Sequence, residues 1–378
     1  MTGIAAKVAV RALTLPADFH VSWAGPCPSW IAADVCLGSE EGRLFFSPGE
    51  GRLHPGDNRF LGSGEAVNGV AFLGNDRIAI SSRSELSFMT VPRHPGETPL
   101  RAVFPAGAHG VIAAASGYFV APLGPSGIMM YKPGSQQPHP LTVHRFDPAL
   151  NLYRAISIVD KGAETLVFAA RSEGIISVGA LGDPTTKLDS HHCWESSDKS
   201  DIIDVCSLAP QTRSIAALNW DNEILLIRDV LSETERPAPF QFPGIAGTAY
   251  RILSMQGHLV VLTSRSLYVL EGLGHRFLEG HPVHREPTRV ASFPMDAVDI
   301  NPCGEGQFLV VLPEAVNMID LGLLLGGPNG AKPSNGAPER EVDFVTARVP
   351  TASNDRLTQR SVPQYHEPVH QEPIHMPV

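Results

Sequence analysis

One short pattern recurs along the chain and limits the fold more than any other feature of the sequence. Residues 202–230 show it in full, as three apolar runs separated by turns that are rich in Pro, Asn and Asp. Short apolar runs between such turns are typical of β-strands. Three of them in so short a segment, without a helical period, predict an antiparallel meander.

The polar turn and the last strand of this unit are the easiest parts to follow along the chain. They recur at intervals of roughly 42 to 49 residues, which is the range of propeller blades. The strand before each turn carries small or β-branched residues, which would let neighbouring sheets pack closely. The seven turns begin at Glu40, Arg83, Pro125, Ser172, Asn219, Ser264 and Pro313.

Seven four-stranded units predict an all-β fold, a closed seven-bladed β-propeller of antiparallel blades over residues 1–325. Closure removes the exposed sheet edges that invite aggregation. The alternating segment 4–15 is expected to supply the outer strand of the last blade and close the ring, because it directly precedes the inner strand 19–23. Residues 341–349 also alternate and are the alternative closing strand. Residues 326–378 are otherwise predicted to be a Gly/Pro-rich linker and a largely disordered tail.

The order of strands and turns in the seven units resembles that of WD-repeat β-propellers. The fifth unit ends in Ile227-Arg228-Asp229, where that family often has Trp-Asp, and the seventh ends in Met318-Ile319-Asp320. The Gly-His dipeptide that usually opens a repeat is missing, so the family's His–Ser/Thr–Asp–Trp hydrogen-bond network is not carried over. The resemblance implies a rigid platform for protein–protein contacts without catalysis.

Charge and cysteine content exclude several classes of protein. The net charge of −10 argues against a nucleic-acid partner or a polybasic membrane-binding surface. The sequence shows no run of transmembrane length and no signal-peptide core. Its five cysteines are odd in number and scattered, which argues against a disulfide framework. We therefore expect a cytoplasmic protein, either a monomer or a subunit of a hetero-complex.

The sequence offers little catalytic chemistry. It has no G-x-S-x-G nucleophile elbow, and Cys36 and Cys206 lie in apolar runs, where a cysteine acts as a small buried hydrophobe. Residues 189–193 group Asp, His and Cys, and the tail adds three histidines, but neither pattern matches a closed zinc site. We expect no catalytic residue, no metal and no cofactor.

The strongest candidate for a functional feature is a set of arginines at equivalent positions of the blades. They lie in the turn between the second and third strands, or at the start of the first strand after a tyrosine, and both places open on the same face of a propeller. Arg, Tyr and Trp are enriched at binding hot spots. The candidate partner-binding residues are Arg83, Arg154, Arg171, Arg251, Arg265, Tyr153, Tyr250 and Trp220.

Such a face predicts a protein partner with an acidic docking surface, because guanidinium groups bind carboxylates through paired hydrogen bonds. The alternative for these residues is that they are ordinary solvated turn residues. The alternative function is a propeller hydrolase or lyase with an acid/base or metal site at the central axis, where Asp34, Asp204 and Asp299 would be inner-strand carboxylates. We expect such carboxylates to bond to neighbouring blades instead, so a non-catalytic interaction scaffold is the preferred prediction.

Overall fold

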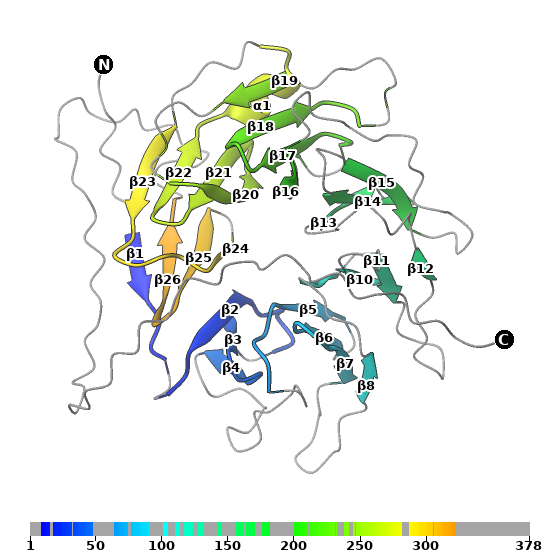
Figure 1. Ribbon diagram of the computed structural model, residues 1–378, viewed down its shortest axis with the longest axis vertical. Helices are drawn as coiled ribbons and strands as arrows, with labels where there is room; N and C mark the ends of the chain where they lie inside the picture. The colour runs from blue at the N-terminus through cyan, green and yellow to red at the C-terminus, as the bar shows by residue number, and fades with distance from the viewer. Residues whose placement is uncertain are drawn as a thin grey trace, which may run out of the picture. The chain divides into compact units, whose positions relative to one another are not determined.

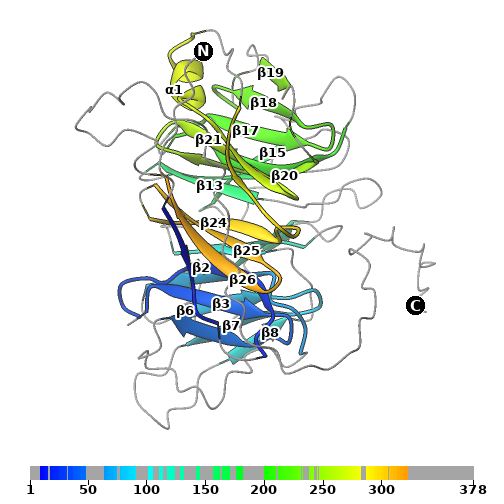
Figure 2. The same ribbon diagram turned by 90° about the vertical axis from the view of Figure 1, so that its left-hand side faces the viewer.

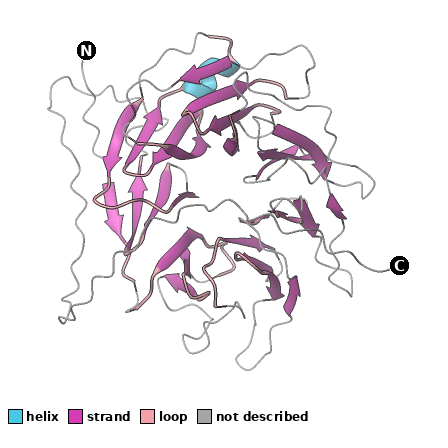
Figure 3. Ribbon diagram, viewed as in Figure 1, coloured by secondary structure: helices cyan, strands magenta, loops and turns pink. Residues whose placement is uncertain are grey.

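A computed structural model describes the strands and many of the turns of the predicted units (Figure 1). The described residues are 9–15, 18–31, 33–47, 64–74, 77–90, 101–104, 110–113, 117–123, 128–131, 142–144, 156–161, 164–170, 176–181, 200–209, 212–230, 232, 238–241, 245, 247–281, 287–304 and 306–321. Within them the fold is all-β apart from one short helix, α1 (Leu273–Leu278), as Figure 3 shows.

The described residues form seven antiparallel sheets, and each is named here after its lowest-numbered inner strand. The β2 sheet contains β2 (Val21–Pro26), β3 (Val35–Ser39) and β4 (Leu44–Ser47). The β5 sheet contains β5 (Gly69–Leu73), β6 (Arg77–Ser81), β7 (Leu86–Thr90) and β8 (Arg101–Phe104). The β9 sheet contains β9 (Ile112–Ala113), β10 (Phe119–Pro122), β11 (Ile128–Tyr131) and β12 (Thr142–His144).

The β13 sheet contains β13 (Ile156–Lys161), β14 (Glu164–Ala170) and β15 (Ile176–Leu181). The β16 sheet contains β16 (Ile202–Ser207), β17 (Ile215–Asn219), β18 (Glu223–Ile227) and β19 (Ala238–Gln241). The β20 sheet contains β20 (Ala249–Met255), β21 (His258–Thr263), β22 (Ser266–Leu270) and β23 (Thr288–Ser292). The β24 sheet contains β24 (Asp299–Gly304), β25 (Gln307–Leu312), β26 (Ala315–Asp320) and β1 (Ala9–Ala12).

The N-terminal strand β1 is the outer strand of the β24 sheet. It runs antiparallel to β26, with Ala9 opposite Asp320 and Ala12 opposite Asn317, and Figure 2 shows the two strands side by side. The Leu13 N–H extends the ladder by donating to the Val316 carbonyl at 2.9 Å. The first and last strands of the described residues therefore pair in one sheet. The alternative closing segment 341–349 lies outside the described residues.

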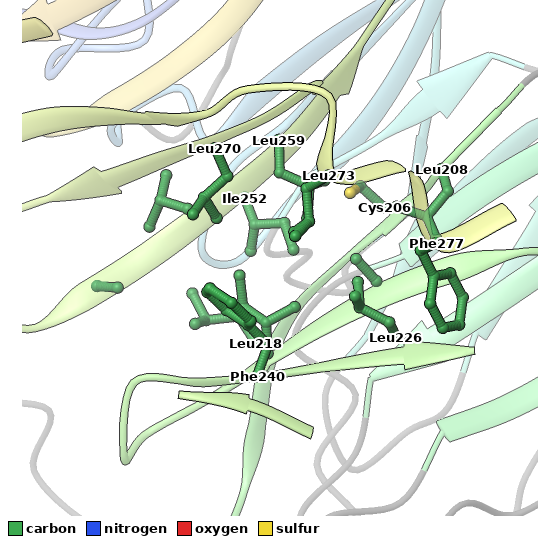
Figure 4. Close-up of a cluster of buried hydrophobic side chains, with 14 of the residues drawn as sticks. Cys206, Leu208, Leu218, Leu226, Phe240, Ile252, Leu259, Leu270, Leu273 and Phe277 are labelled. Carbon is green, nitrogen blue, oxygen red and sulfur yellow. The ribbon is translucent and has the colours of Figure 1, made fainter. Parts of the chain in front are cut away.

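Inner strands carry the contacts from each sheet to the next. β2 contacts β5, and contacts continue from β5 to β9, β9 to β13, β13 to β16, β16 to β20, β20 to β24, and β24 to β2. Apolar clusters fill the space between neighbouring sheets, and Figure 4 shows the one between the β16 and β20 sheets. There Leu218 and Leu226 pack with Ile252 and Leu259, all at most 1% exposed. Burial of these apolar side chains is the main force that holds the sheets together.

Gly38 on β3 illustrates why the second strands are built from small residues. A Cβ atom on Gly38 would lie 2.6 Å from the Cβ of Val67, which belongs to the segment before β5. Only glycine at position 38 allows β3 and the segment before β5 to approach this closely. The sequence analysis expected Asp34 on an inner strand, whereas β3 begins at Val35 and continues through Gly38 and Ser39. Asp34 precedes the strand and is exposed.

The helix α1 was not expected from the sequence. It lies in the connection between β22 and β23. Leu273 and Phe277 are one helical turn apart and are 2% and 6% exposed, because both cover the cluster between the β16 and β20 sheets (Figure 4). Arg228 packs its guanidinium over the Phe277 ring at 5.1 Å and donates to the Phe277 carbonyl. Packing against the sheets therefore stabilises a helix that is too short to form by itself.

Candidate functional site

Three inner strands meet through the side chain of Arg251 on β20. Its Nε lies 3.1 Å from Asp299 Oδ1 on β24, and its Nη1 lies 3.7 Å from Asp204 Oδ1 on β16. The Asp204 side chain is 5% exposed, and its Oδ2 accepts a hydrogen bond from the Ile252 N–H at 2.8 Å. Each acid therefore ties its own sheet to the β20 sheet through Arg251.

Asn301 extends this connection to a fourth sheet. Its Nδ2 donates to Asp299 Oδ2 at 2.9 Å and to the Ala24 carbonyl of β2 at 2.8 Å. Asp204, Arg251, Asp299 and Asn301 thus form a polar chain that crosses the β16, β20, β24 and β2 sheets. We call these four residues the inner polar chain.

The electrostatics of the inner polar chain follow from its burial and its charges. Asp299 and Asp204 raise the pKa of Arg251 above its usual value, so that the guanidinium stays charged. Burial raises the pKa of the Asp204 carboxyl, although Arg251 opposes the rise. The two carboxylates thus join neighbouring sheets, as the sequence analysis expected of Asp204 and Asp299. Asp34, the third carboxylate considered there, does not lie on an inner strand.

The turn between β17 and β18 carries the most exposed aromatic side chain among the described residues. Trp220 is 42% exposed, and its main-chain N–H donates to the main-chain carbonyl of Asp201, just before β16. Asn222 has a φ of 62°, a left-handed conformation that asparagine tolerates better than most residues. Its Oδ1 accepts from the Ala249 N–H at 2.7 Å, so this turn is connected to the start of β20.

The neighbouring turn, between β21 and β22, reaches the β24 sheet. Arg265 is 54% exposed, with its Nε 2.7 Å from Asp296 Oδ1, and it donates through Nη1 to the Pro294 carbonyl. The Tyr250 hydroxyl donates to the Ala297 carbonyl at 2.5 Å. These bonds connect the start of β20 and the adjacent turn to the segment that leads into β24.

Hydrogen bonds and ion pairs therefore link the turns and strand starts of these three sheets at one end of their strands. Val298, just before β24, is 42% exposed, and its N–H donates to the Val311 carbonyl near the turn between β25 and β26. We call the exposed residues of these linked segments, apart from glycine and proline, the Trp220 surface. They are Trp220, Asp221, Thr248, Arg265, Val298 and Glu314.

The structure separates the residues that the sequence predicted for a binding face. Trp220 and Arg265 belong to the Trp220 surface, and Tyr250 lies beneath it, half-buried. Arg251 lies near the start of β20, as predicted, but its side chain forms part of the inner polar chain. Both described arginines of this region are ion-paired, with Asp296 or with Asp204 and Asp299.

The remaining predicted residues lie elsewhere. Arg83 is exposed in the turn between β6 and β7, where hydrogen bonds from Ser84 lower the pKa of Glu65 and Arg83 lowers it further. Arg154, Arg171 and Tyr153 lie outside the described residues. The sequence analysis missed Val298, Asp296 and Asn301, although the spacing of Asp299 and Asn301 on one strand face could have indicated a polar pair.

Cys36 and Cys206 are buried, as expected from their apolar runs. Burial raises the pKa of both thiols well above the usual value, so neither is an activated nucleophile. In the part of the chain that the structure describes, no three His, Cys, Asp or Glu side chains are grouped to hold a metal ion. The helix found in that part has six residues, and none there could cross a membrane.

Comparison with known proteins identifies the fold. No protein-family model matches the sequence, and no curated protein matches it significantly. Solved structures do match, beginning with the β-propeller domain of Cps50 (Swd1) from Myceliophteria thermophila, at 11% identity and a TM-score of 0.58 over 82% of this chain and 99% of that one.

The WD40 β-propeller domain of Doa1 is similar at 14% identity, with a TM-score of 0.57 over 85% of this chain and 97% of that one. The computationally designed protein Ika8 follows at 10% identity, with a TM-score of 0.51 over 79% and 82%. The chain therefore has a divergent WD-repeat-like β-propeller fold, which agrees with the resemblance seen in its repeating units.

Proposed function

We propose that this protein is a non-catalytic scaffold that binds a partner protein through the Trp220 surface. The proposal rests chiefly on the exposure of Trp220, a residue that is 42% exposed in a hydrogen-bonded turn. A large aromatic side chain on a rigid turn gives contact area at little entropic cost, which is why tryptophan is enriched at binding hot spots. Val298 adds a second exposed apolar side chain to the same surface.

A rigid platform suits this role, and we propose that the seven sheets are the blades of one closed propeller. The cyclic series of inner-strand contacts supports closure, as does the pairing of β1 with β26. Four described cysteines are free, which fits a protein of the reducing cytoplasm, acting as a monomer or as a subunit of a hetero-complex.

The alternative function, a hydrolase or lyase at the axis, needs carboxylates that are available to a substrate. Asp204 and Asp299 instead share Arg251, and both also accept hydrogen bonds from main-chain N–H groups. This arrangement favours a structural role for the two acids, so we prefer the scaffold to the enzyme.

Site-specific cross-linking tests the scaffold directly. A photoreactive phenylalanine analogue replaces Trp220 in one variant and Val103 in another; Val103 is 47% exposed on β8 and serves as the matched control. After irradiation in cells, mass spectrometry should find a specific protein joined to position 220 and not to position 103.

Affinity purification with Trp220→Ala should then lose that protein, while Val103→Ala retains it and both variants keep the wild-type melting temperature. Equal cross-linking at the two positions, or full capture by Trp220→Ala, would place the binding site elsewhere. Arg251 is unsuitable for this test because its substitution would disturb four sheets at once.

A further inference from the structure

We propose that Asn301 acts as an inner latch, a side-chain contact that holds the last sheet to the first at the edge opposite the closing strand β1. The inference rests on the closed propeller proposed above. It goes further, because it assigns a second closing contact that does not depend on β1. The covalent order of the strands and the hydrogen bonds of Asn301 carry the argument.

The boundary between the β24 and β2 sheets differs from the other boundaries in how the chain connects it. At each of the others, the chain runs from the last strand of one sheet into the inner strand of the next. At this boundary the chain reaches β2 from β1, which is bound to β26 by hydrogen bonds alone. A covalent linker keeps the effective concentration of two neighbours high. Contacts across the β24–β2 boundary must therefore supply stability that a linker supplies elsewhere.

Asn301 supplies such a contact at the inner edge of the sheet. Among the described strands, β24 and β1 are the two edges of this sheet, with β25 and β26 between them. From β24, Asn301 Nδ2 donates to the Ala24 carbonyl on β2 at 2.8 Å, a bond between residues 277 positions apart. Asn301 and β1 thus act at opposite edges of one sheet, and neither can replace the other.

The Ala24 carbonyl needs this donor because of the register of β2. The Cys27 N–H donates to the Asp34 carbonyl, and bonding directions alternate along a strand, so the Ala24 carbonyl points away from β3. Ala24 is 0% exposed and belongs to the apolar cluster between the β24 and β2 sheets. A main-chain carbonyl in such a place costs free energy when it loses its hydrogen-bond donor.

Asp299 holds the amide of Asn301 in place. Its Oδ2 accepts from Asn301 Nδ2 at 2.9 Å, while its Oδ1 accepts from the Ile300 N–H at 2.8 Å and lies 3.1 Å from Arg251 Nε. The carboxylate is fixed on one side and fixes the amide on the other. Such preorganisation lowers the entropy that the Asn301 side chain loses when it bonds to β2.

Thiol labelling at two neighbouring positions of β25 tests the latch in the full-length protein. Val311 lies in the cluster between the β24 and β2 sheets, and Val310 in the cluster between the β20 and β24 sheets; both are 0% exposed. Val311→Cys therefore reports opening of the boundary that Asn301 crosses. Val310→Cys is the matched reporter for a boundary that the chain itself connects. A maleimide reaches a buried thiol only when the protein opens around it, and peptide mass spectrometry gives the labelling rate at each position.

Asn301→Ala should accelerate labelling at position 311 about fivefold, the factor that corresponds to the loss of one hydrogen bond. It should have little effect at position 310 and on the native Cys206, which lies between the β16 and β20 sheets. Asn301→Asp keeps the shape of the side chain but replaces its N–H donor with an oxygen, so it should also accelerate labelling at position 311.

Ser254→Ala is the matched control variant. It removes a hydrogen bond from the Ser254 hydroxyl to the Leu208 carbonyl, which joins the β20 and β16 sheets across a boundary that the chain connects. The labelling rate at position 311 should stay at the wild-type value in this variant.

Two outcomes would overturn the latch. Unchanged labelling at position 311 in both Asn301 variants would mean that the boundary is held without this side chain. Equal acceleration at positions 310 and 311 would mean that Asn301 stabilises the whole protein and not one boundary. Failure of the closed propeller itself looks different: position 311 would be labelled much faster than position 310 even with Asn301 intact.

Discussion

Arg251 shows how the structural environment of a residue decides its role. In the sequence, Tyr250 and Arg251 look like a polar pair at the start of a strand, suited to a binding face. In the structure, the guanidinium compensates Asp204, a carboxylate that is only 5% exposed. A carboxylate removed from water is costly unless it is paired and hydrogen-bonded. We therefore expect the main effect of Arg251 to be on stability.

Replacing Arg251 with methionine should lower the free energy of unfolding by about 2 kcal/mol. This value lies between those typical of exposed and of fully buried ion pairs, because the Arg251 side chain is one-third exposed. The change leaves Asp204 without its cation. Arg265→Met, which removes an exposed pair, should cost less than about 1 kcal/mol. Urea unfolding of both variants measures the difference, and equal effects would contradict the structural role of Arg251.

At the scale of the strand, the small side chains of the second strands control how closely neighbouring sheets approach. Gly38 faces Val67 across a gap that leaves no room for a methyl group. The Val67 N–H donates to the Ser39 carbonyl at 3.0 Å, and the Ser22 hydroxyl donates to the Val67 carbonyl at 2.8 Å. The segment before β5 is thus held directly against the β2 sheet, and a larger residue at position 38 must push the two apart.

Gly38→Ala should therefore destabilise the protein by about 1 to 3 kcal/mol, the range for an overpacked site. Gly74→Ala is the matched control, since a Cβ at Gly74 meets nothing within 4 Å and its φ is not positive. The control should be neutral or slightly stabilising, because alanine reduces the freedom of the unfolded chain. Thermal melts compare the two variants. If Gly38→Ala melts like Gly74→Ala, the close approach of the β2 and β5 sheets is not needed for stability.

At the scale of the whole molecule, the two ends of the described sequence meet in the β24 sheet. Four residue pairs join β1 to β26, and Leu13 and Leu15 pack against a cluster that also contains Val311 and Val316. If the sheets form a closed ring, this sheet is where it closes. Loss of β1 would then expose the edge of β26 and weaken the contact between the first and last blades.

Deletion of residues 1–16 should lower the melting temperature of the whole protein in one cooperative transition. Deletion of residues 341–378, which include the alternative closing segment 341–349, should leave it near the wild-type value. Differential scanning fluorimetry measures both. A large loss on the C-terminal deletion with little change on the N-terminal one would mean that residues 341–349 close the ring.

The sequence by itself determined the local architecture. Alternation of apolar residues and the placement of turn residues are properties of neighbouring positions, so they were sufficient to predict the meander units, the N-terminal strand and the buried state of Cys36 and Cys206. Strand boundaries were predicted less well: Asp34 was expected on an inner strand, but β3 begins only at Val35. The helix α1 was missed because its formation depends on the cluster that it covers.

Only the tertiary structure decided which distant residues meet. Asp204, Arg251 and Asp299 come from three different units, and no local pattern shows that one arginine lies between two acids. In the same way, Arg265 pairs with Asp296 from the next unit, a contact that its own turn does not indicate. The pairing of charges depends on how the sheets pack against one another, and that packing brings together residues far apart in the chain. The fold, and not the composition of the turns, therefore decides which arginines of this region are ion-paired.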